Sequence, residues 1–343
     1  MEENVFFNIM NKRLFISGAR RRATLKDVAR HVGLSVSVVS RALNRRPDKN
    51  ARVAPDTVRK ITLAAKALNF RRNRAAEFVK RGALPTIGVF VPPAVDRLMA
   101  DLLFGIAEIA REDDFPLQID SDFSLQGFRR FMRHNLDLAH SGVISYPMLI
   151  THPQIAREVE LFRAGGGKVV LLNSALKIPG VPVVGMDERL GGRLAAERLL
   201  ARNCKCFALA GEFKERGPGF EEKLTAAGCS MESFSEDAGG LRELVKFCRS
   251  AAKPVGIFAV NDRLALVIIR SLRGAGLVVG RDVLVVGYDD MEMANESDPP
   301  LTTIHQPFRE EGHLAARKLI NLIYGETEQS VLVSPRLVAR ESG

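Results

Sequence analysis

From Thr86 onward, short apolar stretches alternate with segments of helical periodicity, and this alternation restricts the chain to few folds. The apolar stretches are rich in β-branched residues and nearly continuous, as strands covered on both faces are. Repeated strand-helix order predicts parallel sheets with right-handed crossovers. The expected strands are TIGVFVP, GVISY, KVVLLN, CFALAG, VGIFAVND and DVLVVGYDD, and the expected helices are LMADLLFGIAEIARE, ITHPQIAREVELFRAGG, LGGRLAAERLLARN and RLALVIIRSLRGAG.

Two such sheets facing each other would form a hinged ligand cleft, because doubly wound sheets bind ligands at the carboxyl ends of their strands. At 343 residues, the chain is long enough for two or three domains. We therefore expect a two-lobed α/β body with a ligand site between the lobes.

Positive charge is concentrated in the first quarter of the chain. Residues 1–84 contain 20 Lys and Arg against 6 Asp and Glu, a net charge of +14, whereas the remainder contains 30 against 34, a net charge of −4. Lys and Arg displace the counterions condensed on phosphates, so this distribution favours a polyanion-binding head on a mildly acidic body. A merely solvated charged surface would not confine the excess to one quarter of the chain.

Metal, cofactor and membrane functions lack support in the sequence. No window reaches the roughly 18 uninterrupted apolar residues of a membrane span. The first 22 residues begin with acids and end with bases, the reverse of a secretory signal, so a cytoplasmic location is expected. No cofactor and no metal site is predicted, and the four cysteines, which lack paired motifs at zinc spacing, are expected to be reduced thiols: Cys204, Cys206, Cys229 and Cys248.

The stretch TLKDVARHVGLSVSVVSRALN, residues 24–44, predicts two short helices joined at a glycine. Thr24 and Asp27 have the spacing of a capping box, and Gly33 provides a permissive backbone at which the first helix can stop. Ser35 can cap the second helix. A third helix is expected from Pro55, with Val58, Ile61, Ala65 and Leu68 as its buried stripe.

Such a helix-turn-helix presents its second helix to the major groove of DNA, which is about 12 Å wide. The first turn of that helix points at base edges, which makes Val36 and Ser37 candidates for reading bases, with Arg41 one turn later able to donate two bonds to guanine. A solvated surface arginine remains the alternative for Arg41. Thr24, Ser35, Ser40 and Asn44 suit phosphate contacts.

In their order, three segments of the chain resemble the lactose repressor/galactose repressor (LacI/GalR) family of bacterial transcriptional regulators. They are TLKDVARHVGLSVSVVSRALN, VAPDTVRKITLAAKALNFRRNRAAEFVKRG and TIGVFVP. The resemblance implies a linker helix over Asn73 to Lys80 that orders on the operator and wedges a side chain into the minor groove. Val79 occupies the wedge position, where the family has leucine, and valine is a smaller wedge with lower helix propensity.

The resemblance also implies how the chain is organised. We expect an N-terminal extension at 1–22, a helix-turn-helix DNA-binding domain at 23–72, a hinge helix and linker at 73–85, and a two-lobed effector-binding and dimerisation domain at 86–343. The body is expected to have the periplasmic-binding-protein-like fold. The fold class is therefore an N-terminal all-α helix-turn-helix head plus an α/β two-lobed periplasmic-binding-protein-like body.

Residues of the effector site are implied by the same family pattern, at positions where strands end. Arg216 in ERGPGF would donate paired bonds to the effector, and Asp289 in GYDD would accept from its hydroxyls. The remaining candidates are Asp96, Ser145, Asn173, Asn261 and Phe308. Purely structural roles remain the alternative for four of these residues. Arg216 and Asp289 can form a buried ion pair. Phe308 can belong to the core, and Asn173 can cap a turn.

Two positions depart from the family pattern. Asp96 to Met99, DRLM, stands where the family has Asn-Pro-Phe-Phe, which removes a ring-stacking surface and adds an acid and a base. Asn173 stands where many members carry an aspartate. The ligand is therefore expected to differ from the usual neutral sugars, with a carbohydrate or its phosphate as the leading class by resemblance.

No nucleophile elbow, phosphate loop or HExxH motif occurs, so the chain is not expected to be an enzyme. The sequence instead indicates a transcription regulator, a repressor by resemblance, that binds double-stranded operator DNA as a homodimer. One helix-turn-helix reads only a half-site, so the operator should be palindromic. The alternatives are a solute-binding protein without specific DNA recognition and, less favoured, an α/β enzyme with a DNA-binding head.

Overall fold

The computed structural model describes residues 23–43, 53–68, 70, 83–93, 96–148 and 152–343. The chain divides into two compact units, Met1–Lys80 and Arg81–Gly343. The described parts of these units are called the head and the body below. The expectations for the 1–22 extension, for Asn44, and for Asn73, Val79 and Lys80 of the linker lie outside the described residues.

The head contains three helices, α2 (Leu25–Val32), α3 (Val36–Ala42) and α5 (Pro55–Ala67). The predicted capping box is confirmed: the Thr24 hydroxyl accepts from the backbone N–H of Asp27 at 3.3 Å, and the Thr24 N–H donates to the Asp27 carboxylate at 2.8 Å. Gly33 ends α2 at a φ of +70°, a left-handed conformation that a residue without a side chain adopts readily.

A small apolar core holds the three head helices together. Val28, Val39 and Ile61, one from each helix, have no exposed surface. The predicted stripe of α5 is confirmed at Ile61 and Ala65, while Val58 and Leu68 pack partly buried against the same core, and Ala64 joins it. The core fixes α3 against the other two helices and leaves its opposite face at the surface.

The body consists of two lobes, each built on a six-stranded sheet. The sheet of the N lobe has the order β11-β5-β4-β3-β1-β2, and that of the C lobe has the order β12-β10-β9-β8-β6-β7. The first five strands of each lobe are thus arranged in the same way. All pairs are parallel except β10 with β12. The expected parallel sheets are confirmed.

The strands have the following bounds. The N lobe contains β1 (Leu84–Val91), β2 (Leu117–Ser121), β3 (His140–Ser145), β4 (Lys168–Leu172), β5 (Val183–Met186) and β11 (Val331–Val333). The C lobe contains β6 (Cys206–Ala210), β7 (Met231–Phe234), β8 (Val255–Ala259), β9 (Val283–Asp289), β10 (Thr302–His305) and β12 (Arg336–Val338).

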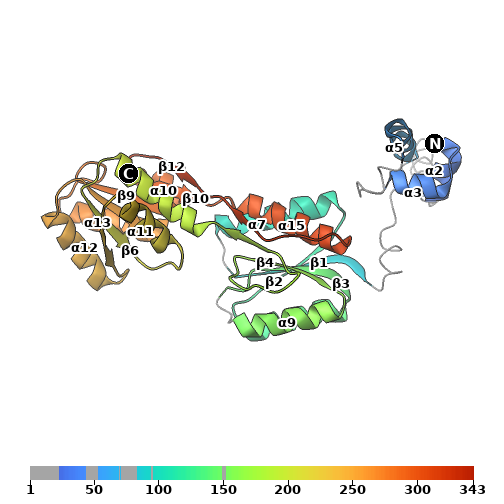
Figure 1. Cartoon of the computed structure of the whole chain (residues 1–343), viewed down its shortest axis with the longest axis horizontal. Coiled ribbons are helices and arrows are strands. Elements are labelled where there is room, and N and C mark those ends of the chain that lie inside the picture. The colour runs from blue at the N-terminus through green and yellow to red at the C-terminus, as the bar shows by residue number, and fades with distance from the viewer. Residues whose placement is uncertain (1–22, 44–52, 69, 71–82, 94–95, 149–151) are drawn as a thin grey trace, which may run out of the picture. The chain divides into compact units, whose positions relative to one another are not determined.

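Helices cover both faces of each sheet. In the N lobe, α7 (Arg97–Glu112) and α15 (Phe308–Ile323) pack together on one face, and α9 (His152–Ala164), against which α8 (Leu125–Asp137) packs, covers the other (Figure 1). The C lobe contains α10 (Glu188–Ala201), α11 (Arg216–Ala226), α12 (Ala238–Ser250), α13 (Asp262–Gly274) and the short α14 (Glu292–Glu296).

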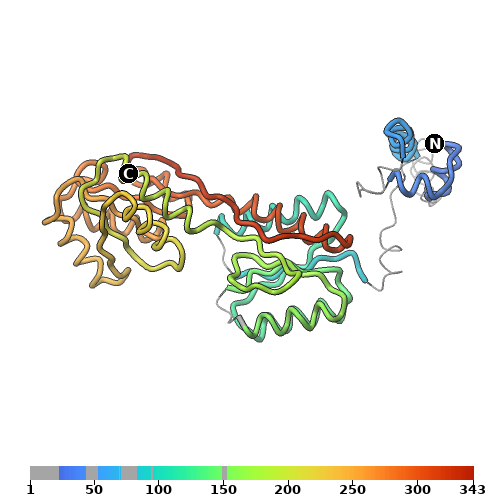
Figure 2. The backbone as a smooth tube through the Cα atoms, viewed as in Figure 1, coloured from blue at the N-terminus to red at the C-terminus, as the bar shows by residue number. Residues whose placement is uncertain are grey.

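The chain crosses between the lobes at three places, between β5 and α10, between β10 and α15, and between β11 and β12. These connections can be followed along the backbone tube in Figure 2. Because α15 follows a strand of the C lobe but packs in the N lobe, its first residues lie next to the crossover. These three connections together can act as a hinge about which the lobes move relative to each other.

Glycines permit the close approach of α10 and α11 in the C lobe. A Cβ on Gly192 of α10 would lie 2.0 Å from the carbonyl oxygen of Arg216 on α11, and one on Gly219 of α11 would lie 2.1 Å from the carbonyl oxygen of Arg189 on α10. The glycine-containing segment LGGRLAA of α10 thus forms a helix–helix contact. None of the described helices is long and apolar enough to span a membrane.

All four cysteines are free thiols, as expected: Cys204 and Cys248 are buried, and Cys206 and Cys229 are partly buried. Burial raises the pKa of Cys204 and of Cys248 to about 12, which keeps both thiols protonated and unreactive near neutral pH.

Candidate functional site

The first turn of α3 forms the exposed part of the helix-turn-helix. Val36 is 40% exposed and Ser37 is also exposed, although α3 as a whole is anchored by the buried Val39 and Ala42. The Nε of Arg41 donates to the carbonyl oxygen of Ser37 at 3.3 Å. This bond holds the side chain along the helix surface, and its terminal nitrogens have no hydrogen-bond partner among the described residues.

The candidate phosphate contacts in the head are also the helix caps. The Ser35 hydroxyl accepts from the Val38 N–H at 3.3 Å and lies 3.0 Å from the Ser37 hydroxyl. Thr24 caps α2, and Ser40 is partly buried on α3. The caps place both helix N-termini at the surface, where free N–H groups and the helix dipole favour a phosphate.

In the body, Arg216 lies at the start of α11 and is almost fully buried, at 4% exposure. Its Nε and Nη2 donate to the two carboxylate oxygens of Glu188 at 2.6 and 3.1 Å, a bidentate pair. Its Nη1 donates to the Val260 carbonyl at 2.5 Å and lies 3.6 Å from a carboxylate oxygen of Asp289. The structure thus contains the Arg216–Asp289 ion pair considered as an alternative, and Glu188 is the closer partner.

Two aromatic rings enclose the Arg216 guanidinium. Its carbon atom lies 3.6 Å from the ring centroid of Tyr288 and 3.8 Å from that of Phe213. Stacking on both faces adds a cation–π attraction to the ion pair with Glu188. Arg216 therefore has little freedom to reorient toward another partner.

Asp289 ends β9 and is held by Gln306, whose side-chain N–H donates to the carboxylate at 2.6 Å. Burial raises the pKa of Asp289 to about 7, even though the nearby Arg216 acts in the opposite direction. The φ of Asp289 is +112° and that of Asp290 is +52°, so two consecutive residues with side chains adopt left-handed backbone here. Backbone of this kind persists where the surrounding contacts enforce it, and it often marks a functional site.

Three further candidates use their side chains to hold loops at strand ends. The Asp96 carboxylate caps α7 by accepting from Met99 N–H at 3.0 Å, and the Asn261 amide oxygen caps α13 by accepting from Leu264 N–H at 2.8 Å. The Asn173 amide oxygen accepts from Met186 N–H at 2.9 Å, and its φ is +45°. Each of these residues therefore has a structural role, and each keeps other polar atoms for a ligand.

The last two candidates, Ser145 and Phe308, are buried. Ser145 ends β3 with no exposed surface, and its hydroxyl has no hydrogen-bond partner among the described residues. Phe308 is the first residue of α15, is 6% exposed and lines a cavity of about 520 Å³ that also includes Asp101, His305 and Gln306.

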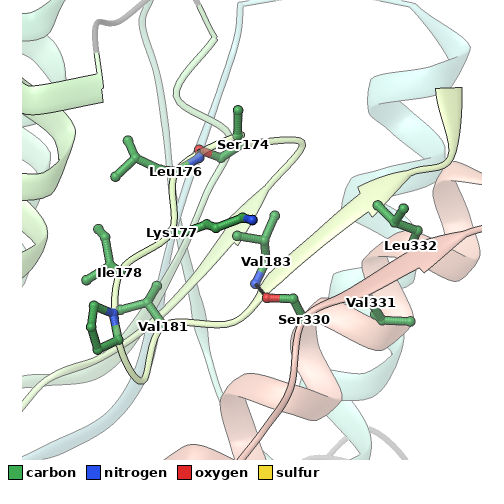
Figure 3. Close-up of a pocket in the computed structure, with 11 residues that line it drawn as sticks. Ser174, Leu176, Lys177, Ile178, Val181, Val183, Ser330, Val331 and Leu332 are labelled. Atoms are coloured by element: carbon green, nitrogen blue, oxygen red, sulfur yellow. Dashed lines mark hydrogen bonds between the residues drawn. The ribbon is translucent and has the colours of Figure 1, made fainter. Parts of the chain in front are cut away.

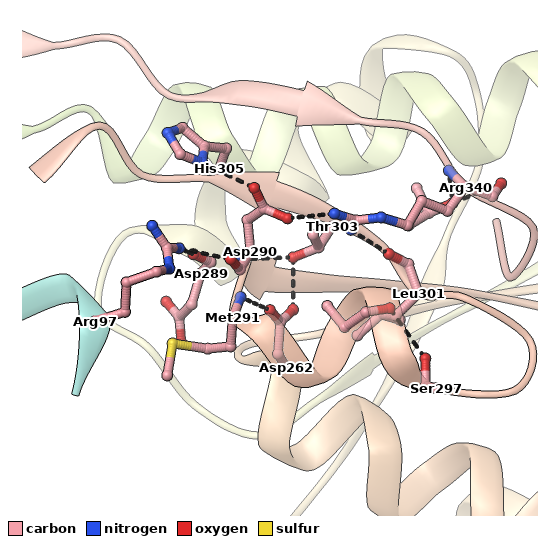
Figure 4. A network of polar contacts seen from close by, with 12 residues as sticks. Arg97, Asp262, Asp289, Asp290, Met291, Ser297, Leu301, Thr303, His305 and Arg340 are labelled. Atoms are coloured by element: carbon pink, nitrogen blue, oxygen red, sulfur yellow. Dashed lines mark hydrogen bonds and ion pairs between the residues drawn. The ribbon is translucent and has the colours of Figure 1, made fainter.

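Arg97 of the N lobe connects to the strand ends of the C lobe. Its Nη2 donates to the backbone carbonyls of Asp290 and Asp289 at 2.5 and 3.2 Å, and its Nη1 donates to Asp101 at 2.8 Å (Figure 4). The Asp290 carboxylate in turn accepts from Arg340 at 2.7 Å. The base in the DRLM segment thus joins the two lobes beside Asp289.

Behind this contact, the buried Asp262 organises the loop after β9. It accepts from the Thr303 hydroxyl at 2.5 Å and from the Met291 N–H at 2.7 Å (Figure 4). Burial raises the pKa of Asp262 to about 6. These bonds give Asp262 a structural role in holding the loop.

Several residues of this region were not among the site candidates predicted from the sequence. Glu188 directly follows the capping Asp187 after β5, and Gln306 directly follows β10, so a search of every strand end for polar residues would have found both. Glu311 interrupts the buried face of α15, where Phe308, Ala315 and Leu319 are apolar. An acid at an apolar position of an amphipathic helix was the available signal for it.

The body contains further cavities, one of which borders the Arg216 region through Phe213. One, of about 830 Å³, is lined by the ends of β6 and β7 and the start of α11, including Gly211, Phe213 and Ser235. The other, of about 490 Å³, is a mostly apolar pocket between the loop at 174–183 and residues 330–332 (Figure 3). Within the part of the chain that the structure describes, no group of three or more His, Cys, Asp or Glu side chains is placed to hold a metal ion.

Comparison with known proteins identifies the family. The model of bacterial regulatory proteins of the lacI family matches residues 24–73, and that of the periplasmic binding protein-like domain matches residues 196–343. The ribose operon repressor of Escherichia coli (strain K12) is 28% identical over 337 residues, covering 93% of this chain and 99% of the relative. The transcriptional regulator CelR of Thermobifida fusca is 30% identical over 353 residues, covering 94% and 99%.

Solved structures agree in fold. A CelR–cellobiose complex aligns with a TM-score of 0.63 at 26% identity. The alignment covers 94% of this chain and 100% of that chain. A LacI family regulator from Enterococcus faecium with bound ribose aligns with a TM-score of 0.62 at 25% identity, covering 75% and 98%. The lac repressor dimer bound to operator and an anti-inducer aligns with a TM-score of 0.63 at 23% identity, covering 94% and 99%. The chain therefore belongs to the lacI family of bacterial regulatory proteins.

Proposed function

We propose that this protein is a sequence-specific transcription repressor that binds a palindromic operator as a homodimer and is controlled by a small molecule bound between the lobes of its body. The observation that carries the proposal is the capped helix-turn-helix of a basic head, whose second helix exposes Val36 and Ser37 and has the partly exposed Arg41 one turn later. A helix presented in this way fits the major groove, where hydrogen bonds to base edges distinguish sequences.

Contact roles in the head follow from this geometry. Val36 and Ser37 contact base edges, and Arg41 donates to guanine from one turn later. Thr24, Ser35 and Ser40 bind phosphates and set the position of the helices on the duplex. For residues outside the described ranges, the proposal rests on the family resemblance alone: Asn44 contacts a phosphate, and the linker from Asn73 to Lys80 binds DNA with Val79 as its minor-groove wedge.

The domain boundaries belong to the same proposal: a DNA-binding domain at 23–72, a hinge helix and linker at 73–85, and an effector-binding and dimerisation domain at 86–343. A dimer supplies two heads for the two halves of a palindrome.

The effector binds where strand ends of both lobes meet. Ser145, Asn173 and Phe308 contribute from the N lobe and its crossover, and Asn261 and Asp289 contribute from the C lobe, with Arg216 fixing the Asp289 side of the site. Asp96 positions the start of α7. The names of relatives and neighbours refer to ribose and cellobiose, which supports a carbohydrate-related effector.

Selection of bound sequences from a random pool of double-stranded DNA tests the proposal. The purified full-length chain at moderate salt should enrich a two-fold symmetric sequence with two half-sites. Absence of any enriched motif, with and without sugars, would support the alternative of a solute-binding protein with only electrostatic affinity for DNA.

A further inference from the structure

Glu311 is a buried carboxyl group without a charged partner among the described residues. It lies in the first turn of α15, has no exposed surface, and neither of its carboxylate oxygens accepts a hydrogen bond of normal geometry from a described residue. A carboxyl group in such a place is costly, because it loses its hydration and gains no compensating bond. A buried carboxyl group with this cost indicates a role in function rather than in stability.

Polar groups from both lobes surround Glu311. Burial, together with the negative charge of Glu188 in the C lobe, raises the pKa of Glu311 to about 8, while the amide of Asn173 acts in the opposite direction. Burial and the charge of Glu311 also raise the pKa of Tyr146. Tyr146 follows Ser145, whose buried hydroxyl is itself unpaired. Glu311 therefore faces the region where the strand ends of the two lobes approach each other.

This region contains more negative than positive groups. Glu188, Asp289 and Glu311 contribute three carboxyl groups, whereas Arg216 pairs with Glu188 and Asp289, and Arg97 donates to backbone carbonyls and to Asp101. Arg216 is already committed to both oxygens of Glu188 and to the Val260 carbonyl.

Among the described residues, none donates a hydrogen bond of normal geometry to a Glu311 carboxylate oxygen, and none forms an ion pair with it. A ligand with a positive charge can supply the missing counter-charge.

We propose that the effector of this protein is a polyhydroxylated compound carrying an ammonium group, as in an amino sugar, and that the ammonium pairs with Glu311. This inference rests on the proposed function, because it assigns a chemical class to the ligand of the same site. An ammonium has three N–H donors and can satisfy both oxygens of Glu311 while compensating its charge. Asn173 lies within reach of Glu311 and can bind a neighbouring hydroxyl.

Other sources of positive charge fit less well. A metal ion would require several carboxylate, His or Cys ligands converging on one point, and the described residues contain no such group. A neutral sugar would bring no counter-charge, so Glu311 would stay protonated and gain only hydrogen bonds from it, whereas an ammonium would stabilise its ionised form. An organic cation with hydroxyl groups satisfies both requirements.

Isothermal titration calorimetry of the full-length protein with matched sugar pairs tests the inference. The pairs are glucosamine with glucose, galactosamine with galactose, and mannosamine with mannose, which differ by one amino group. At least one amine should bind ten-fold or more tightly than its parent sugar. Tighter binding of every neutral sugar, or failure of all three amines to bind at millimolar concentration, would overturn the inference.

Variants of Glu311 separate ligand binding from structure. Glu311→Gln should abolish the preference for the amine, whereas Glu310→Gln, an exposed neighbour on the same turn, should leave it unchanged. In the ligand-free protein, Glu311→Gln and Glu311→Leu should both raise the midpoint of thermal unfolding, because they remove an unpaired buried carboxyl group. A lower midpoint for both variants would mean that Glu311 is a structural residue, and would overturn the inference.

The outcome also separates this inference from the proposed function. A neutral sugar that binds tightly and alters operator affinity would contradict the ammonium ligand and leave the repressor assignment intact. An amino sugar that binds through Glu311 without altering the affinity for any DNA would support the ligand class and contradict the regulatory role.

Discussion

Arg216 and Glu188 form a bidentate ion pair that joins the first residues of α11 and α10, with donor-acceptor distances of 2.6 and 3.1 Å. The two helices can approach closely because glycines lie at their contact, Gly192 on α10 and Gly219 on α11. The ion pair thus fixes one wall of the candidate ligand site in the C lobe.

Removing the acid from this pair should destabilise the body strongly. Glu188→Gln leaves a buried guanidinium with one charged partner, Asp289 at 3.6 Å, and should lower the free energy of unfolding by about 3–5 kcal/mol. Urea unfolding followed by circular dichroism measures the change. Glu222→Gln is the control, because Glu222 pairs with Arg189 at an exposed position and should cost less than about 1 kcal/mol. Equal effects of the two variants would contradict this account.

Arg97 should stabilise the arrangement of the lobes seen here. Arg97→Ala removes two charge-assisted hydrogen bonds from the N lobe to the carbonyls of Asp289 and Asp290, each worth about 1.5–3 kcal/mol. Hydrogen exchange at the amides of residues 289–291 should become faster in the ligand-free protein. Arg111→Ala, an exposed arginine on the same helix, should leave exchange unchanged. Unaltered exchange in Arg97→Ala would show that the contact does not hold the lobes together.

Stability of the body should fall as pH rises from 5 to 8. Burial raises the pKa of Asp262, Asp289 and Glu311 above the ordinary values of 3.8, 3.8 and 4.5, to about 6, 7 and 8. The folded state therefore holds protons that the unfolded chain releases. The stability that these groups contribute is complete below pH 4 and is lost as pH rises through the folded pKa values.

Each group that titrates in this way contributes a slope of up to about 1.4 kcal/mol per pH unit. Urea unfolding at pH 5.5, 7 and 8.5 measures the slope. Glu311→Gln should reduce it above pH 7, where Glu311 is the last of the three to ionise. Stability that is constant or rises over this range would be inconsistent with buried, protonated carboxyl groups.

Arg41 should determine sequence discrimination rather than affinity alone. Its terminal nitrogens are available on the exposed side of α3, and a bidentate contact to guanine discriminates by about 1–3 kcal/mol. Arg41→Ala should weaken binding to the selected operator by that amount and binding to scrambled DNA much less, as measured by fluorescence anisotropy. Lys26→Ala, an exposed cation on α2, is the control for a general loss of charge. Equal losses on both duplexes would make Arg41 a phosphate contact.

The sequence was sufficient for six interior strands and insufficient for the other strands. The interior strands β5 and β10 were not predicted, although they are mostly buried, because each has only four residues. The six expected strands are all present, because their apolar residues are covered on both faces. The strands β2 and β7 were missed because they lie at sheet edges, and their residues, LQIDS and MESF, are largely polar and partly exposed. Edge strands of this kind lack the apolar continuity on which the assignment relied.

The candidate ligand site shows a similar division. Arg216 and Asp289 could be named from a motif, and the structure brings them within 3.6 Å of each other. Glu188 and Glu311 could not be paired with this site from local pattern alone, because each lies on a helix that follows a crossover between the lobes. Proximity across a crossover depends on how the lobes pack, which the spacing of residues along the chain does not encode.

The most direct test of the central claim is whether a ligand of the body changes the affinity of the head for DNA. A small molecule that raises the thermal unfolding midpoint of the full-length protein would be titrated into a complex with the selected operator, followed by fluorescence anisotropy. Coupling free energies of about 1–3 kcal/mol are typical, so the operator affinity should change by at least five-fold. A ligand that stabilises the body but leaves operator affinity unchanged would contradict the account of a ligand-controlled repressor.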